Sequence, residues 1–178
     1  VNEAGLLMDC SHTGRRCSLD IMAASTQPVI FSHANPLTLV EHGRNVSDEQ
    51  IRACASTGGV VCMSGLSFFL GRDNPTADDV ARHAAYVADL VGIEHVGIGL
   101  DICFQQDGID DTPWGDFAPE YWWPATAGYK QTSPPSFTPI ETWAALPNAL
   151  QNAGMTRDEV KSVMGENMLR VARQVWRT

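Results

Sequence analysis

Two short apolar runs that each end in Ser-His constrain the fold of this chain most. Residues 6–12 read Leu-Leu-Met-Asp-Cys-Ser-His, and residues 29–33 read Val-Ile-Phe-Ser-His. Each run has the length of a buried parallel strand and carries an imidazole at its C-terminal end. The segment between them is long enough for a crossover helix, and right-handed crossovers place parallel strands side by side. We therefore expect both histidines at the same edge of one sheet.

A pair of imidazoles at neighbouring strand ends indicates part of a metal site. Neutral imidazole is a common ligand of zinc. A single histidine at a strand end is more often a hydrogen-bonded structural group, and this interpretation stays open for His12 and for His33 taken alone. The repetition of strand, Ser-His and turn favours the metal site for the two together.

The rest of the chain alternates strand and helix patterns, which predicts an α/β fold with parallel strands. Helix capping boxes begin at Ser47, Thr76 and Thr156. A helical segment that begins near residue 138 is expected to be interrupted at Pro147. The predicted strands cover residues 6–12, 29–33, 60–63 and 95–101, the predicted helices lie within 13–25, 47–57, 76–92, 138–154, 156–164 and 168–176, and residues 64–75 are expected to form a loop.

One long segment, residues 102–138, departs from this alternation. It is rich in proline and in aromatic residues, among them Trp114, Trp122 and Trp123. Loops of this length inside a domain are usually functional or disordered. The aromatic content favours an ordered flap over a linker. We expect a single domain over residues 1–178 that carries this loop.

Charge and cysteine content restrict the partners and the compartment. The net charge of −9 and a pI near 4.8 argue against nucleic acid and anionic membranes, so a small-molecule partner is expected. The five cysteines lack CxxC spacing, which favours reduced thiols and a cytoplasmic location. No apolar run is long enough for a transmembrane segment. The first residues lack an initiator Met and resemble a helix end at Gly5, so we expect the chain to continue a longer sequence.

The strand ends also define the expected chemistry. No strand is followed by a G-x-G-x-x-G or Walker sequence, which removes support for dinucleotide and P-loop proteins. The alternation allows an open sheet or a barrel, and a barrel would collect His12, His33 and Asp101 at one pocket. Asp101 could bind a metal, move a proton or simply cap its loop. Arg44 could hold a substrate carboxylate by a bidentate pair or lie in solvent as a surface group. The other three histidines, His42, His83 and His95, are expected to be structural or solvated.

The ordered set of motifs resembles the membrane dipeptidase (renal dipeptidase) family of zinc metallopeptidases. The matching segments are residues 9–12, 28–35, 44–48, 58–60, 82–83, 96–101 and 165–171. This resemblance implies a (β/α)8 TIM-like barrel of the amidohydrolase-like type, with two zinc ions joined by a carboxylate and a hydroxide. It also implies that His12 and His33 bind one zinc, that Arg44 binds the terminal carboxylate of a dipeptide, and that Asp101 assists proton transfer.

The chain also departs from the family pattern. The family's first half supplies a His-x-Asp pair and a bridging Glu, and this sequence has no such half. The resemblance therefore implies only the C-terminal half of the barrel, about strands 5–8, with at most a partial zinc site. A longer gene product, a separate N-terminal half-barrel or a homo-oligomer could complete the site, and we favour the first two. The isolated chain is expected to be inactive or poorly active, because a catalytic zinc usually has three protein ligands.

The function that the resemblance implies is a zinc-dependent dipeptidase in which a metal-bound hydroxide attacks the peptide carbonyl. Two alternatives remain open. The chain could be a non-catalytic half-barrel binding module, or a related amidohydrolase that acts on another amide, ester or lactam. Zinc content separates the binding module from the enzymes, and a substrate panel separates the two enzymes.

Overall fold

The computed structural model describes residues 1–102, 124–127 and 136–176, so most of the predicted loop over residues 102–138 lies outside the described residues. The strands are β1 (Met8–Asp9), β2 (Val29–Ile30), β3 (Val61–Met63) and β4 (Val96–Ile98). The α-helices are α1 (Arg15–Ala24), α2 (Asp48–Ser56), α3 (Ser67–Leu70), α4 (Ala77–Val91), α7 (Thr142–Asn152), α8 (Arg157–Lys161) and α9 (Asn167–Val175). Short 3-10 turns cover Asn2–Ala4, Ile93–His95 and Ala125–Ala127, and a π-helical turn over Ser162–Glu166 joins α8 to α9. These elements confirm the mixed α/β fold.

The four strands are parallel and lie in chain order. β1 pairs with β2, and β3 pairs with β4, both in parallel. Among the described residues, an isolated parallel bridge between Phe31 and Val61 joins the two pairs. The residues that follow the strands therefore meet at one edge of the sheet, as the two Ser-His runs predict.

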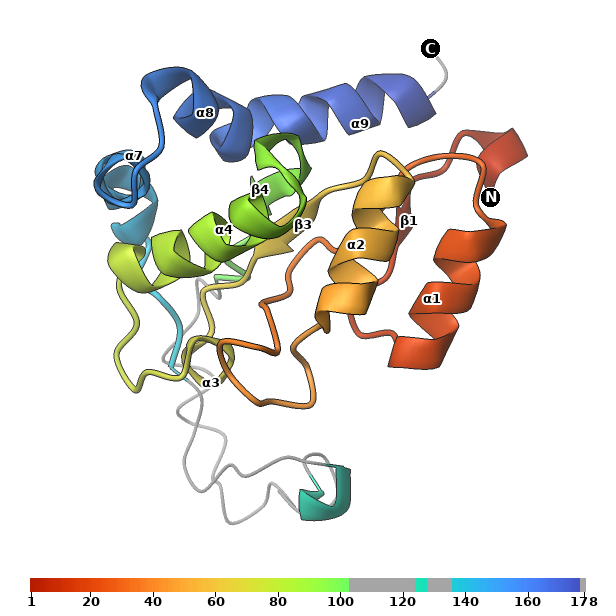
Figure 1. Cartoon of the computed structure of the whole chain (residues 1–178). Coiled ribbons are helices and arrows are strands. Elements are labelled where there is room, and N and C mark those ends of the chain that lie inside the picture. Colours follow the sequence, from red (N-terminus) through yellow and green to blue (C-terminus); the bar gives the residue numbers. More distant parts are fainter. Residues whose placement is uncertain (103–123, 128–135, 177–178) are drawn as a thin grey trace.

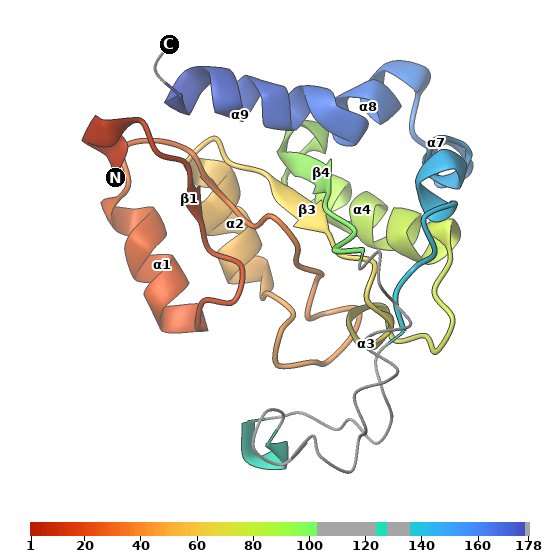
Figure 2. The same ribbon diagram turned by 180° about the vertical axis from the view of Figure 1, so that it is seen from behind.

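Both faces of the central strands are covered. Val29, Phe31 and Met63 pack into the main core with α2 and α4, while Ile30 and Cys62 face a second cluster with α9. This alternation follows from the two-residue period of a strand. Figures 1 and 2 show α1, α2 and α4 on one face and α9 across the end of the sheet at which the strands begin.

Side-chain hydrogen bonds hold helix α9 at the end of the sheet where the strands begin. The Asn167 side-chain amide donates to the carbonyl oxygens of Ile93 and Val96, each at 2.8 Å. The Arg170 guanidinium donates to the carbonyl oxygens of Gly58 and Glu94 at 2.9 Å. These four carbonyl groups lie just before or at the start of β3 and β4. The C-terminal helix therefore closes the amino ends of the strands.

Two local predictions were wrong. The predicted loop over residues 64–75 contains α3, where buried Phe69 and Leu70 fix a helical turn that ends at Gly71, whose φ is 67°. Pro147 does not interrupt α7. Leu146 and Leu150 are fully buried on either side of the proline, and this packing holds both turns in place despite the missing backbone donor.

The free thiols agree with the expectation of reduced cysteines. Cys10, Cys54 and Cys62 are free and buried, whereas Cys17 is free and exposed. Burial raises the pKa of the Cys62 thiol to about 12, so the thiol stays protonated. Cys103 lies outside the described residues.

In the part of the chain that the structure describes, no helix combines the length and the apolar character that crossing a membrane requires.

A buried histidine in the core predicts acid sensitivity. His83 in α4 has no solvent exposure, and burial followed by the neighbouring Arg82 lowers its pKa from 6.5 to about 4. Below pH 6.5 the unfolded chain binds a proton that the folded protein does not, so the free energy of unfolding falls as the pH drops towards 4. We expect His83→Leu to reduce that loss by about 3 kcal/mol, as measured by urea unfolding across this pH range. An unchanged pH dependence in the variant would contradict the assignment. His42 has a similarly low pKa of about 4, so part of the loss remains in the variant.

Candidate active site

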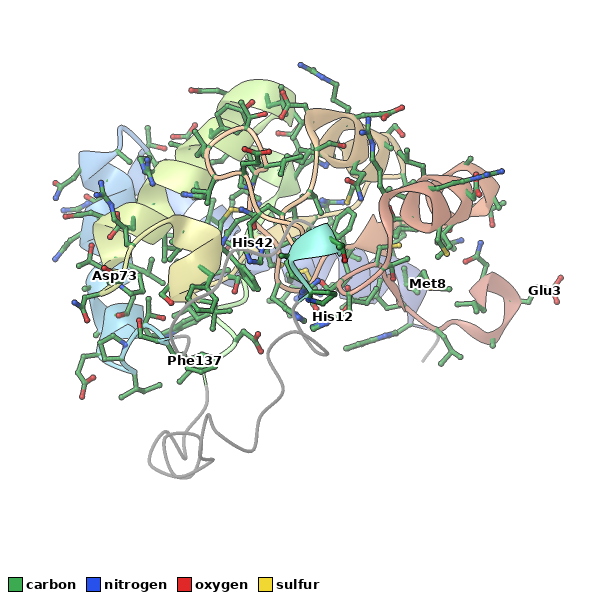
Figure 3. All side chains as sticks on the ribbon, turned by 90° about the horizontal axis from the view of Figure 1, so that it is seen from below. Glu3, Met8, His12, His42, Asp73 and Phe137 are labelled. Atoms are coloured by element: carbon green, nitrogen blue, oxygen red, sulfur yellow. The ribbon has the colours of Figure 1, made fainter. Side chains whose placement is uncertain are left out.

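The two predicted metal-binding histidines lie in contact. His12 follows β1 and His33 follows β2, and their Nε2 atoms are 2.8 Å apart. The ring planes meet at 61° with centroids 4.9 Å apart. Figure 3 looks from below onto this end of the sheet, with His12 near the centre of the view. The predicted placement of both histidines at one sheet edge is therefore confirmed.

The backbone at two predicted site residues is left-handed. Among the described residues, His12 (φ 61°) and Asp101 (φ 58°) are the only non-glycine residues with positive φ. Such a conformation costs an L-residue roughly 1–2 kcal/mol, and it occurs often at functional sites. At both positions it turns the chain sharply just after a strand. The sheet edge therefore carries these two side chains at some cost in backbone energy.

Arg44 and Asp101 act electrostatically on His12. Partial desolvation lowers the pKa of His12 below its ordinary value, and the positive charge of Arg44 and the neighbouring His33 lower it further. Asp101 and Asp9 oppose this shift. All four predicted site residues therefore belong to one electrostatic cluster. The low pKa keeps the imidazole neutral at pH 7, which is the form that binds a metal.

A pocket of about 280 Å³ adjoins His12 and is lined by Arg44. Its wall also includes Cys10, Phe31 and Gln50. The Arg44 guanidinium carbon lies 5.5 Å from the centroid of the Phe69 ring, a cation–π arrangement that steadies the side chain. The volume is near the lower end of the range for small-molecule sites. The pocket therefore offers a cation and an imidazole to a small ligand.

The other three histidines are placed by structural contacts. His42 is buried and its ring stacks on Phe68 at 6.4 Å between centroids. His83 is buried in α4, and His95 Nδ1 lies 2.8 Å from the Gly59 carbonyl oxygen at the far end of the sheet. These positions agree with the expectation of structural roles.

The sequence reasoning missed Asp9 and the serine before each histidine. Asp9 Oδ1 accepts hydrogen bonds from the backbone N–H groups of Ser11 at 2.9 Å and Ser32 at 3.0 Å. Ser32 Oγ donates to Asp9 Oδ2 at 2.5 Å and lies 2.8 Å from His33 Nδ1. The repeated Ser-His sequence was the available signal, because a small hydroxyl residue directly before a metal-binding histidine can reach its ring.

The two imidazoles fit part of a zinc site. Two nitrogen ligands about 2.0–2.1 Å from a tetrahedral zinc lie about 3.3 Å apart, so the observed pair would separate only slightly around an ion. Within residues 1–102, 124–127 and 136–176, no three His, Cys, Asp or Glu side chains are placed so that they could hold one metal ion. The described residues therefore fit two ligands of a zinc ion and leave its coordination incomplete.

A model of the membrane dipeptidase family (peptidase family M19) matches residues 1–116, which is more than half of the chain. The chain belongs to this family.

Similar proteins include fungal dipeptidases. An uncharacterized dipeptidase of Schizosaccharomyces pombe is 30% identical over 178 residues, covering 96% of this chain and 36% of that protein. Dipeptidase verJ of Clonostachys rogersoniana is 35% identical over 114 residues, covering 62% of this chain and 29% of that protein. The chain thus spans about a third of the length of the curated relatives that it matches.

Solved structures share the fold. An amidohydrolase from Pseudomonas aeruginosa is 31% identical with a TM-score of 0.79, covering 98% of this chain and 54% of that one. A metallopeptidase from Rhodobacter sphaeroides, bound to a phosphinate mimic of the dipeptide L-Ala-D-Ala, is 21% identical with a TM-score of 0.74, and this chain spans 44% of it. The second match supports the fold alone.

The left-handed backbone at Asp101 predicts an unusual order of variant stabilities. Asp101→Gly should be more stable than Asp101→Ala by about 1 kcal/mol, because only glycine adopts this conformation without a Cβ clash. Urea unfolding of the two variants measures the difference. The control is Asp78, an exposed helical residue in the first turn of α4, where the alanine variant should be the more stable. The same order at both positions would contradict backbone strain at Asp101.

Proposed function

We propose that this chain forms the C-terminal half, about strands 5–8, of a (β/α)8 barrel that hydrolyses the peptide bond of dipeptides with zinc. The observation that carries the proposal is the pair of Nε2 atoms 2.8 Å apart at neighbouring strand ends, beside a pocket lined by Arg44. Membership of the membrane dipeptidase family supports it.

His12 and His33 would hold the zinc through Nε2. When bound, zinc lowers the pKa of a coordinated water to about 7 and polarises a substrate carbonyl. The chain's contribution is to hold the two rings convergent and to lower the pKa of His12, which partial desolvation and the neighbouring positive charge of Arg44 do.

Arg44 would bind the C-terminal carboxylate of the dipeptide. Its guanidinium lines the pocket next to His12 and is steadied by the Phe69 ring. A planar guanidinium pairs with a carboxylate through two parallel hydrogen bonds, which fixes the orientation of the substrate. Asp101, exposed at the end of β4, would deliver a proton to the leaving amide nitrogen.

The remaining zinc ligands would come from outside the described residues. Two imidazoles fall short of the three protein ligands typical of a catalytic zinc. Among residues 1–102, 124–127 and 136–176, β1 and β4 each pair with one neighbouring strand, so both outer edges of the sheet can accept further strands. Because the chain spans about half of the solved structures that it matches, we favour a longer protein or a separate N-terminal half over a homo-oligomer.

A second candidate is a related amidohydrolase that acts on another amide, ester or lactam. The likeness to the Pseudomonas aeruginosa amidohydrolase, at 31% identity, favours it. A panel of dipeptides, amides, esters and lactams separates the two activities.

Metal analysis combined with native mass spectrometry tests the zinc site. We expect the assembled protein to contain zinc, and His33→Ala to contain much less of it because one of the ligands is removed. His95→Gln, which changes a histidine at the opposite end of the strands, is the control and should keep its zinc. A metal-free species that stays metal-free in added zinc would refute the catalytic assignment and leave a binding module.

Substrates with and without a free carboxylate test Arg44. In the assembly that hydrolyses dipeptides, Arg44→Lys should raise KM for a dipeptide about tenfold, because the bidentate pair becomes a point contact. The same dipeptide with an amidated C-terminus should show little change in KM between the two proteins. Equal effects on both substrates would place the carboxylate elsewhere.

A further inference from the structure

A continuous line of polar contacts crosses the sheet edge from Asp9 to His12. Asp9 Oδ2 lies 2.5 Å from Ser32 Oγ, and Ser32 Oγ lies 2.8 Å from His33 Nδ1. The line then passes through the His33 ring to Nε2, which is 2.8 Å from His12 Nε2. The line therefore joins β1 and β2 and ends at the proposed zinc position.

The hydrogen bonds in this line can run in only one direction. An ionised carboxylate only accepts, so Ser32 must give its single hydroxyl proton to Asp9. The Ser32 oxygen is then left with lone pairs alone towards His33, and the Nδ1 atom must carry the proton that closes the 2.8 Å contact. A neutral imidazole with a proton on Nδ1 has a free lone pair on Nε2.

We propose that Asp9 and Ser32 are positioning residues that fix His33 as the Nδ1-protonated tautomer and direct its Nε2 lone pair at the metal position. Neither residue touches the metal or the substrate. They act through His33, in the way that carboxylates and hydroxyl groups orient the histidines of metal sites.

The environment of Asp9 keeps it in the accepting form. Partial desolvation raises its pKa, but hydrogen bonds from the Ser32 hydroxyl and from the backbone of Ser11 and Ser32 outweigh it, so the pKa lies below its ordinary value. The backbone of His33 is held as well, because its N–H donates to Ser11 Oγ at 3.1 Å. Both the main chain and the ring of His33 are therefore fixed from β1.

The direction of these hydrogen bonds also fixes the position of the proton on His12 in the metal-free protein. If His33 Nε2 accepts, the 2.8 Å contact between the rings requires a proton on His12 Nε2. The metal-free pair is therefore asymmetric, with His33 set to bind and His12 acting as the donor.

The ¹⁵N chemical shifts of the imidazole rings test the tautomer directly. The full chain is studied without metal at about pH 8.5, well above the ordinary imidazole pKa of about 6.5. We expect a protonated Nδ1 and an unprotonated Nε2 for His33, and a mixture of tautomers in Ser32→Ala. Ser32→Thr keeps the hydroxyl and should restore the wild-type shifts. Ser56→Ala, which removes an exposed hydroxyl that donates to the Ala53 carbonyl oxygen in α2, is the control and should leave them unchanged.

Two results would overturn the inference: an Nε2-protonated His33 in the wild-type chain, or unchanged His33 shifts in a folded Ser32→Ala. If Ser32→Ala does not fold, the wild-type spectrum still decides the tautomer.

The zinc affinity of the assembly that completes the site, measured for the wild-type and variant assemblies by competition with a chromogenic chelator, gives the second readout, and the role towards zinc rests on the proposed function. We expect Ser32→Ala to bind zinc about tenfold more weakly than the wild type, and Ser32→Thr to recover most of that loss. If the wild type binds no zinc while its tautomer depends on Ser32, the proposed function fails and the positioning role stands. If the wild type binds zinc and Ser32→Ala changes neither readout, the positioning role fails alone.

Discussion

The isolated parallel bridge between Phe31 and Val61 is the contact on which the arrangement of the site depends. It joins the pair that carries His12 and His33 to the pair that ends near Asp101. Phe31 is almost fully buried, and its backbone exchanges hydrogen bonds with the strand that contains Val60 and Cys62. Because the strands are parallel, this connection, which the hydrogen bond from the Ala34 N–H to the Cys62 carbonyl oxygen continues, brings their carboxyl ends to the same edge. The two histidines and Asp101 then lie at the same sheet edge, where Asp101 acts electrostatically on His12, although their segments are far apart in the sequence.

The sequence predicted the parts of the fold that depend on local rules. Capping boxes located the starts of α2, α4 and α8, and buried apolar runs located the four strands of the described residues. The prediction failed where distant packing decides the outcome. Pro147 stays inside α7 because Leu146 and Leu150 are buried beside it, and α3 forms because Phe69 and Leu70 are buried. Neither effect has a signal within its own segment.

In the candidate site, too, some features could be predicted from the sequence and others could not. Strand ends and spacing were enough to predict that His12 and His33 meet, because parallel pairing fixes where their backbones lie. The contacts of Asp9 and Ser32 depend on the directions of side chains from two strands. The left-handed backbone at His12 and Asp101 depends on the path that the chain takes after each strand ends. Periodicity in the sequence carries neither kind of information. The role of the long loop over residues 102–138 stays a prediction, since most of it lies outside the described residues.

Helix α9 is anchored to the carbonyl groups at the amino ends of β3 and β4, on the opposite side of the sheet from the histidines. The hydrogen bonds that anchor α9 and the residues of the candidate site thus lie at opposite ends of the strands. Because these contacts lie away from the loops that follow the strands, a change of sequence in those loops leaves the contacts that align the strands in place.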